Sequence, residues 1–451
     1  MNFKDFITNR WHRWKITAEW AAYENVRPPK NPSRRYIDKL VARYIRKGYP
    51  RIERREIELI GAAAVPSIVA AIRDPRNHKP IEELGELEDL GIDTLLALLV
   101  PHAPADVIAI ATPLADDASD KVRKTAAIHL ASLGRAEAIP VLAKLLDDPD
   151  GFVRSYVAIG IRRALKEQRC DKEFRDQIYY LLLNQCDQEW EVAGNDAAKV
   201  LVALNAERAA KDLAQARWLS PDNPCVCEIL DSCSDARIPL PEHLLRCLLE
   251  DSLKHLNGEN SYPHDRIAAG TLIALARASG DRIKSLLEAQ ADSASKYVRE
   301  GAARGLLLLN GVEDPVTFVL TRRSEVGYES LSIPQPTIYC ACVFEAEVCN
   351  GGITQFFGNS SGDRAADTLE ALRLLDHRPS YDALNTAMRL IGPLAREPDR
   401  DMRLAAFEGR YEELRSAFRP LEDAVYASSL TSAMLAHATK HPEQFREAND
   451  A

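Results

Sequence analysis

Apolar residues recur every three or four positions along most of this chain, which is the spacing that gathers them on one face of an α-helix. The first 20 residues display the pattern clearly, because Phe3, Ile7, Trp11 and Trp14 fall on a single stripe. Similar stripes follow one another, and most are rich in alanine and leucine. The pattern therefore predicts an all-α fold.

Two helical segments of similar sequence lie 74 positions apart, as two repeats of about 37 residues would place them. Residues 65–75 read VPSIVAAIRDP, and residues 139–149 read IPVLAKLLDDP. Each segment has a proline in its first turn, where the missing N–H group costs nothing. Each ends at Asp-Pro, because proline cannot continue a helix. The repetition predicts stacked helical units.

A second motif places an arginine after a valine and before a pair of small residues, at Arg123, Arg154 and Arg299. The small pairs allow two helices to approach closely, and Gly134 supplies a helix stop. The two motifs together resemble HEAT repeats, which implies a HEAT-like α-α superhelix, or solenoid, over residues 56–315. We expect the motif arginines and aspartates to bond between neighbouring repeats.

Residues 1–55 are basic, with 15 Lys and Arg against five Asp and Glu. We predict that they form an N-terminal helical cap over the end of the solenoid core. The alternative is a helix that meets a membrane surface, nucleic acid or an acidic partner. Pro28, Pro29 and Pro32 predict a linker before the next helix.

The remainder of the chain is acidic, and it outweighs the basic segment to give a net charge of −9. Residues 56–334 carry −13, and residues 335–451 carry −6. Acidic surfaces attract a basic protein partner and repel nucleic acid, so we expect no direct nucleic-acid binding. One acidic cluster is a candidate partner surface or, alternatively, a solvated loop. Its members are Glu82, Glu83, Glu86, Glu88 and Asp89.

Composition predicts a cytoplasmic protein. No apolar run reaches the roughly 18 to 20 residues of a membrane span. The N-terminus holds tryptophan and arginine where a signal peptide has an apolar core. The nine cysteines are scattered and odd in number, which suits a reducing compartment better than a disulfide framework.

Four cysteines in the weakly repeated middle are candidate zinc ligands: Cys225, Cys227, Cys233 and Cys247. Their spacing matches no familiar zinc module, so we predict no metal and interpret them as small buried hydrophobes. A reactive thiol is the remaining alternative. Pro224 starts a helix there, and Cys225 and Cys227 lie in its first turn, where a thiol pKa can be lowered.

Enzyme signatures are absent: there is no phosphate-binding glycine loop, no His-Glu-x-x-His and no nucleophile elbow. We predict a non-enzymatic protein without a cofactor. The alternative is a HEAT-type enzyme, either a DNA repair glycosylase or a protein similar to a bilin lyase. Its candidate residues would be Trp190 with Glu191 and Asp196, or a basic groove lined by Trp190 or Trp218.

Residues 316–336 have no clear helical period, so we interpret them as the connection into a C-terminal domain, residues 325–451. Residues 337–349 then predict a helix that is apolar on all sides and therefore buried. Glu345 lies in an apolar arc of this helix. A buried carboxylate must be paired, hydrogen-bonded or protonated.

The glycine pair Gly351-Gly352 follows this helix directly, where left-handed backbone is needed, so it predicts a corner. We expect Glu345 or Glu347 to accept hydrogen bonds from the N–H groups freed after Gly352. We also expect Ser360 to cap the next helix, because the residues that follow it have capping-box spacing.

The run FEAEVCNGGITQFF, from Phe344 to Phe357, with NSSG from Asn359, resembles the signature of a small bacterial domain family that includes a DNA-mimic protein. The similarity extends over residues 325–446, with departures at residues 375–377 (LDH) and 422–424 (EDA). The resemblance implies a compact helical domain. It makes the motif positions candidate binding residues: Glu345, Glu347, Asn350, Gly351, Gly352, Gln355, Phe356, Phe357 and Asn359.

The DNA-mimic family also implies a function, because one member resembles DNA in its charge layout and occupies the DNA-binding face of a transcription regulator. The acidic charge of this chain agrees with that role. We therefore predict a protein–protein interaction scaffold whose acidic surfaces bind a basic partner, with mimicry of DNA as the most specific form. The oligomeric state stays open, with a dimer among the alternatives.

Overall fold

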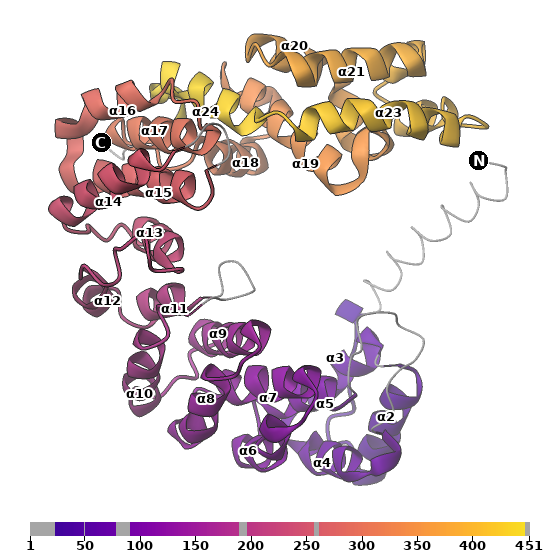
Figure 1. Cartoon of the computed structure of the whole chain (residues 1–451). Coiled ribbons are helices and arrows are strands. Elements are labelled where there is room, and N and C mark those ends of the chain that lie inside the picture. The colour runs from indigo at the N-terminus through magenta and orange to yellow at the C-terminus, as the bar shows by residue number, and fades with distance from the viewer. Residues whose placement is uncertain (1–22, 49, 78–90, 189–195, 257–260, 447–451) are drawn as a thin grey trace. The chain divides into compact units, whose positions relative to one another are not determined.

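The computed structural model describes residues 23–48, 50–77, 91–188, 196–256 and 261–446 (Figure 1). Throughout these ranges the chain forms α-helices joined by short 3₁₀ helices and loops, with no strand. The predicted all-α fold is confirmed. The basic segment forms α2 (Arg34–Arg46) and the start of α3 (Arg51–Ile60), and the proline-containing residues 26–33 before α2 are not helical. Residues 1–22 lie outside the described part. Its function as a cap remains a prediction.

The described helices separate into two compact units. The N-terminal unit contains residues 23–218 and 222–236, and the C-terminal unit contains residues 219–221 and 237–446. The domain boundaries that we drew from the sequence (1–55, 56–315 and 325–451) remain predictions, and the two units are described separately below.

The N-terminal unit continues after α2 and α3 with helices of eight to sixteen residues in the order of the chain. They are α4 (Val65–Arg73), α5 (Gly91–Leu99), α6 (Pro104–Ala111), α7 (Asp120–Leu133), α8 (Ile139–Leu146), α9 (Gly151–Lys166), α10 (Lys172–Leu183), α11 (Ala197–Leu204), α12 (Ala206–Leu213) and α13 (Val226–Asp235).

The C-terminal unit has the same helical character. Its helices are α14 (Glu242–Lys254), α15 (His264–Ser279), α16 (Lys284–Gln290), α17 (Lys296–Leu309), α18 (Pro315–Val326), α19 (Gln335–Gly358), α20 (Ala365–Leu374), α21 (Arg378–Ile391), α22 (Arg400–Ala405), α23 (Tyr411–Tyr426) and α24 (Leu430–Lys440).

The repeat motifs form helix pairs in the predicted way. Proline lies in the first turn of both α4 and α8, and both helices end before their Asp-Pro segments. A side chain at Gly160 of α9 would place its Cβ 2.6 Å from the Cβ of Ala131, so α7 and α9 pack almost backbone to backbone. Gly134 ends α7 in the left-handed conformation, with φ of 63°, as its position in the motif predicts.

Helix α19 runs through the core of the C-terminal unit. Phe344, Val348 and Phe356 are fully buried on it, as expected for a helix with apolar residues on all sides. The same core includes Ala303 and Leu307 of α17. The C-terminal helices therefore share one hydrophobic core with the helix that carries the last repeat motif.

One expectation about secondary structure was wrong. Residues 316–336 do not form a plain connection, because α18 covers Pro315–Val326. Its buried residues are Pro315 and Val319, which are too few to produce a helical period that the sequence pattern could reveal.

Candidate functional site

The family motif surrounds a sharp break in α19. At the break Gly351 has φ of −160° and ψ of 20°, while Gly352 has φ of 79° and ψ of −179°. The positive φ at Gly352 favours glycine. A Cβ atom there would also lie 2.3 Å from Oε1 of Glu422. The motif glycines therefore form a corner between two helical segments, as the sequence predicts.

Helix α23 supplies hydrogen-bond partners for both sides of this break. The hydroxyl of Tyr426 donates to the carbonyl oxygen of Val348 at 2.8 Å. The backbone N–H of Ile353 donates to Oε1 of Glu422 at 2.7 Å. A break in a helix leaves backbone groups without their usual partners, and leaving such a group buried and unpaired is costly. The Glu422 and Tyr426 side chains thus make the break stable.

The expectation that Glu345 or Glu347 would accept the freed N–H groups was wrong. The N–H of Ile353 bonds to Glu422 of α23, whereas the other two carboxylates bond elsewhere. Glu345 bonds toward α24, and Glu347 bonds to residues after the break. The partner comes from a helix distant in sequence, so motif spacing alone could not identify it.

Glu347 joins the two sides of the corner through its side chain. It accepts hydrogen bonds from Nε2 of Gln355 at 2.7 Å, Nδ2 of Asn359 at 2.8 Å and Oγ of Ser361 at 2.6 Å. Partial burial works to raise the pKa of Glu347, but the three donors outweigh it and hold the pKa below its ordinary value. The spacing of the motif thus brings three hydrogen-bond donors to the Glu347 carboxylate.

The predicted cap at Ser360 was also wrong. The 3₁₀ helix η7 (Ser360–Arg364) precedes α20, and its first residues cap no helix through a side chain. The hydroxyl of Ser361 donates to Glu347 instead. The serine pair follows the pattern of a capping box, but the hydroxyl of its second serine, Ser361, is bound to Glu347.

The remaining motif positions divide between surface and core. Asn350 and Gly351 are exposed, whereas Gly352, Phe356 and Phe357 are buried. Most of the motif therefore builds the domain, and Asn350 is the motif side chain that is best placed to reach a partner. The binding role of the whole set remains a prediction.

Glu345 is half-buried between α17, α19 and α24. Its Oε2 accepts a long hydrogen bond of 3.4 Å from Oγ1 of Thr431. Burial raises the pKa of Glu345, and the nearby charge of Glu300 raises it further. Glu300 itself accepts hydrogen bonds from Ser429 at 2.5 Å and Ser432 at 2.7 Å. The N-terminus of α24 thus faces two carboxylates, as its dipole favours.

Arg403 is a central residue that the sequence analysis did not identify. Its side chain is fully buried and bonds the end of α19, with Nε 3.1 Å from the carbonyl oxygen of Phe357 and Nη2 2.8 Å from that of Asn359. Nη2 also lies 2.6 Å from Oδ1 of Asp363, and Nη1 lies 2.6 Å from the carbonyl oxygen of Glu397. Arg403 therefore caps the last turn of α19 and ties it to two loops.

The repeat arginines bond in the same manner. Nη1 of Arg123, Arg154 and Arg299 donates to the carbonyl oxygen six residues earlier, at 3.0, 2.6 and 2.6 Å. Nη1 of Arg403 likewise donates to the carbonyl oxygen of Glu397, six residues earlier, at 2.6 Å. The C-terminal unit thus contains a turn built like those of the HEAT-like repeats.

A sequence signal for this turn exists. The tripeptide Pro-Leu-Ala occurs at residues 113–115 and again at residues 393–395. In each case its proline lies ten positions before the arginine, Arg123 or Arg403. Both tripeptides form 3₁₀ helices, η3 (Pro113–Asp116) and η8 (Pro393–Arg396). A search for repeats that extended into the C-terminal domain would have identified Arg403.

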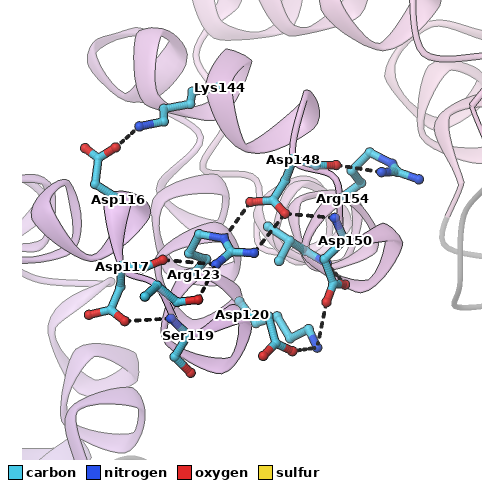
Figure 2. A network of polar contacts seen from close by, with 12 residues as sticks. Asp116, Asp117, Ser119, Asp120, Arg123, Lys144, Asp148, Asp150 and Arg154 are labelled. Carbon is cyan, nitrogen blue, oxygen red and sulfur yellow. Dashed lines mark hydrogen bonds and ion pairs between the residues drawn. The ribbon is translucent and has the colours of Figure 1, made fainter.

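Figure 2 displays the polar network of the repeats around Arg123. Its guanidinium group binds Asp148 through two contacts, Nε to Oδ2 at 2.7 Å and Nη2 to Oδ1 at 3.1 Å. The two side chains are 15% and 7% exposed. Arg154 donates to the backbone carbonyl of the same Asp148. The expected bonding between neighbouring repeats is present, and it occupies these motif arginines.

The candidate zinc ligands do not form a recognisable centre. Cys225 and Cys233 are buried, Cys227 is half-buried and Cys247 is exposed. Burial raises the pKa of the Cys233 thiol to about 12, which disfavours the thiolate. In the described ranges no group of three or more His, Cys, Asp or Glu is arranged to hold a metal ion.

Several other candidates lie outside the described residues. These include the acidic cluster Glu82, Glu83, Glu86, Glu88 and Asp89, the N-terminal tryptophan stripe, and Trp190 with Glu191. Trp218 is described and is buried, 4% exposed, with the guanidinium of Arg217 over its ring. Across the part of the chain that the structure covers, no helix is long and apolar enough to cross a membrane.

Two family models match parts of the chain. Residues 329–441 match the model described as DMP19-like protein, and residues 108–171 match the model described as HEAT repeats. No curated protein and no solved structure matches the chain. Both matches agree with the architecture that the motifs predict. The chain therefore contains HEAT repeats followed by a C-terminal DMP19-like domain.

Proposed function

We propose that this protein is a non-enzymatic scaffold that binds a protein partner, and that the partner is basic. The carrying observation is the pairing of HEAT repeats with a DMP19-like domain in one chain. Repeat solenoids offer extended surfaces on which other proteins bind. The motif side chains Arg123, Glu347 and Arg403 all have partners inside the fold, which supports a structural purpose for these motifs.

The charge of the chain supports a basic partner. After residue 55 the chain has 62 Asp and Glu against 43 Lys and Arg. An acidic surface speeds encounter with a basic protein, and the attraction weakens as salt rises. Nucleic acid would be repelled by the same surface. Mimicry of DNA is the most specific form of this proposal, in which the partner uses its nucleic-acid-binding face.

In the DMP19-like domain, a basic partner would bind most readily to carboxylates that form no ion pair within the chain. Glu370 and Glu413 are engaged in ion pairs with Arg373 and Arg410, at 2.6 and 3.0 Å. Other acids in the described part of this domain are exposed and have no ion pair there: Asp382, Asp401, Glu412 and Asp423. We assign the partner contacts to these unpaired acids.

The proposal is tested by affinity capture with the intact chain as bait in cytoplasmic extract, at low and at high salt. A basic partner should be retained at low salt and released at high salt. If the partner uses its nucleic-acid-binding face, duplex DNA should displace it from the bait. Recovery of no basic protein at low salt would contradict the proposal. If a partner is retained but duplex DNA fails to displace it, the hypothesis of DNA mimicry is wrong.

A matched pair of variants locates the contact. Asp401→Asn with Glu412→Gln removes two unpaired carboxylates, while Glu370→Gln with Glu413→Gln removes two that are already paired. Both changes alter the net charge equally, so any long-range effect of charge is the same. The first variant should weaken capture more than the second. An equal effect would place the contact elsewhere on the chain.

A further inference from the structure

The N-terminal unit contains a cavity of about 390 Å³ that none of the repeat or family motifs explains. Helices α3, α4, α5 and the end of α9 contribute its lining. Its apolar wall includes Ile57, Ile68 and Leu98, which are 1%, 1% and 5% exposed. Pockets for small molecules typically have about 300 to 1,000 Å³ and an apolar lining with a few polar groups. This cavity has that size, but polar groups make up the larger part of its wall.

The polar part of the lining is mainly cationic. Arg54, Arg163 and Arg169 line the cavity, against Glu58 and Glu167, and His102 also contributes to the lining. The two carboxylates already have partners. Nε of Arg54 lies 3.0 Å from Oε1 of Glu58, and Arg169 forms an ion pair with Glu167. Arg169 also donates from Nη1 to the carbonyl oxygen of Ser132 at 2.8 Å.

Arg163 differs from the other two arginines of the lining in the contacts of its side chain. Among the residues that the structure describes, its guanidinium group has no hydrogen bond and no ion pair. Arg163 and Arg169 line the same cavity. Burial lowers the pKa of Arg169, and the charge of Arg163 lowers it further. Two guanidinium groups that converge on one cavity repel each other, and an anion between them would remove that repulsion.

We propose that this cavity binds a small organic anion. Its phosphate or carboxylate group would be held by Arg163 and Arg169, and its apolar portion would lie against Ile57, Ile68 and Leu98. Guanidinium groups suit this task because their planar donors match the oxygens of a phosphate or carboxylate. The site is separate from the DMP19-like domain, and it adds a small-molecule ligand to the proposed scaffold.

Isothermal titration calorimetry of the intact chain at constant ionic strength tests the proposal. The probes are phenyl phosphate, benzoate and inorganic phosphate. Phenyl phosphate should bind more tightly than inorganic phosphate, because its ring buries against the apolar wall. The tighter of phenyl phosphate and benzoate identifies the preferred anionic group. Absence of saturable binding for all three probes would overturn the proposal.

The matched variants are Arg163→Gln and Lys166→Gln. Both residues lie in the last turn of α9 and both changes remove one positive charge, but Lys166 does not line the cavity. Arg163→Gln should weaken phenyl phosphate binding by about tenfold or more, since a charge-assisted bond is lost. Lys166→Gln should leave the affinity nearly unchanged. Equal losses in the two variants would mean a general attraction of anions to the helix end, and would refute the assigned site. Thermal unfolding by circular dichroism checks that both variants are folded.

Discussion

Replacing Gly352 by alanine perturbs the break in α19 through both its backbone conformation and its contact with Glu422. The residue has φ of 79° and ψ of −179°, a backbone region that only glycine adopts readily and that costs other residues about 1 to 3 kcal/mol. The added Cβ would lie 2.3 Å from Oε1 of Glu422, so this side chain must leave the N–H of Ile353. Loss of a hydrogen bond to a charged group costs about 1.5 to 3 kcal/mol. Together the two effects predict about 2.5 to 6 kcal/mol of destabilisation.

Hydrogen exchange followed by mass spectrometry is the suitable assay, because it reports each helix separately. Tryptophan fluorescence would not follow this domain, since all five tryptophans lie at or before residue 218. Exchange in α19 and α23 of the Gly352→Ala variant should be faster by about two to four orders of magnitude. Gly358→Ala is the control, because φ there is not positive and nothing lies within 4 Å of the added Cβ.

A double-mutant cycle with Glu422→Ala tests the stated mechanism. If Gly352→Ala acts by displacing Glu422, then Glu422→Ala should cost much less in the Gly352→Ala background than in the native chain. Fully additive effects would refute this reasoning, because they would mean that the carboxylate keeps its bond to Ile353 in spite of the added methyl group.

Two further predictions concern buried charge. The pKa of Glu345 is raised in the folded chain, so its folded state holds the proton more tightly and loses stability as pH rises above the ordinary glutamate range. Glu345→Gln should therefore be more stable than the native chain at pH 7 and should reduce this pH dependence, as measured by urea unfolding at several pH values; a less stable variant at pH 7 would contradict the assignment. Arg403→Lys keeps the charge but cannot make the four bonds of the buried guanidinium, so it should destabilise the C-terminal unit by about 3 kcal/mol or more. Arg396→Lys, an exposed position nearby, should change stability little in the same urea assay.

Sequence patterns predicted the helices and the corner because these depend on residues close in the chain. The corner follows from the glycine pair itself, and the burial of α19 follows from the apolar residues on all of its sides. The partners at the corner could not be predicted in this way. Glu422 lies 69 residues after Ile353, and Arg403 lies 46 residues after Phe357, so only the tertiary fold brings each pair together.

The candidate binding site was harder to predict for a related reason. Polar residues in a signature motif can serve the fold or a partner, and the sequence does not distinguish the two. Glu347 and Gln355 bond to each other within the domain, whereas the cavity residue Arg163 belongs to no signature at all. Its significance depends on Arg169 lying nearby, six positions later in the chain, across the end of α9.

The salt dependence of partner affinity tests the central claim most directly. The dissociation constant of the captured partner for the intact chain would be measured between about 50 and 200 mM salt, a range over which the Debye length shortens appreciably. The proposed acidic scaffold predicts that affinity weakens by about tenfold or more over this range. An affinity that stays constant across it would contradict binding through the acidic surfaces.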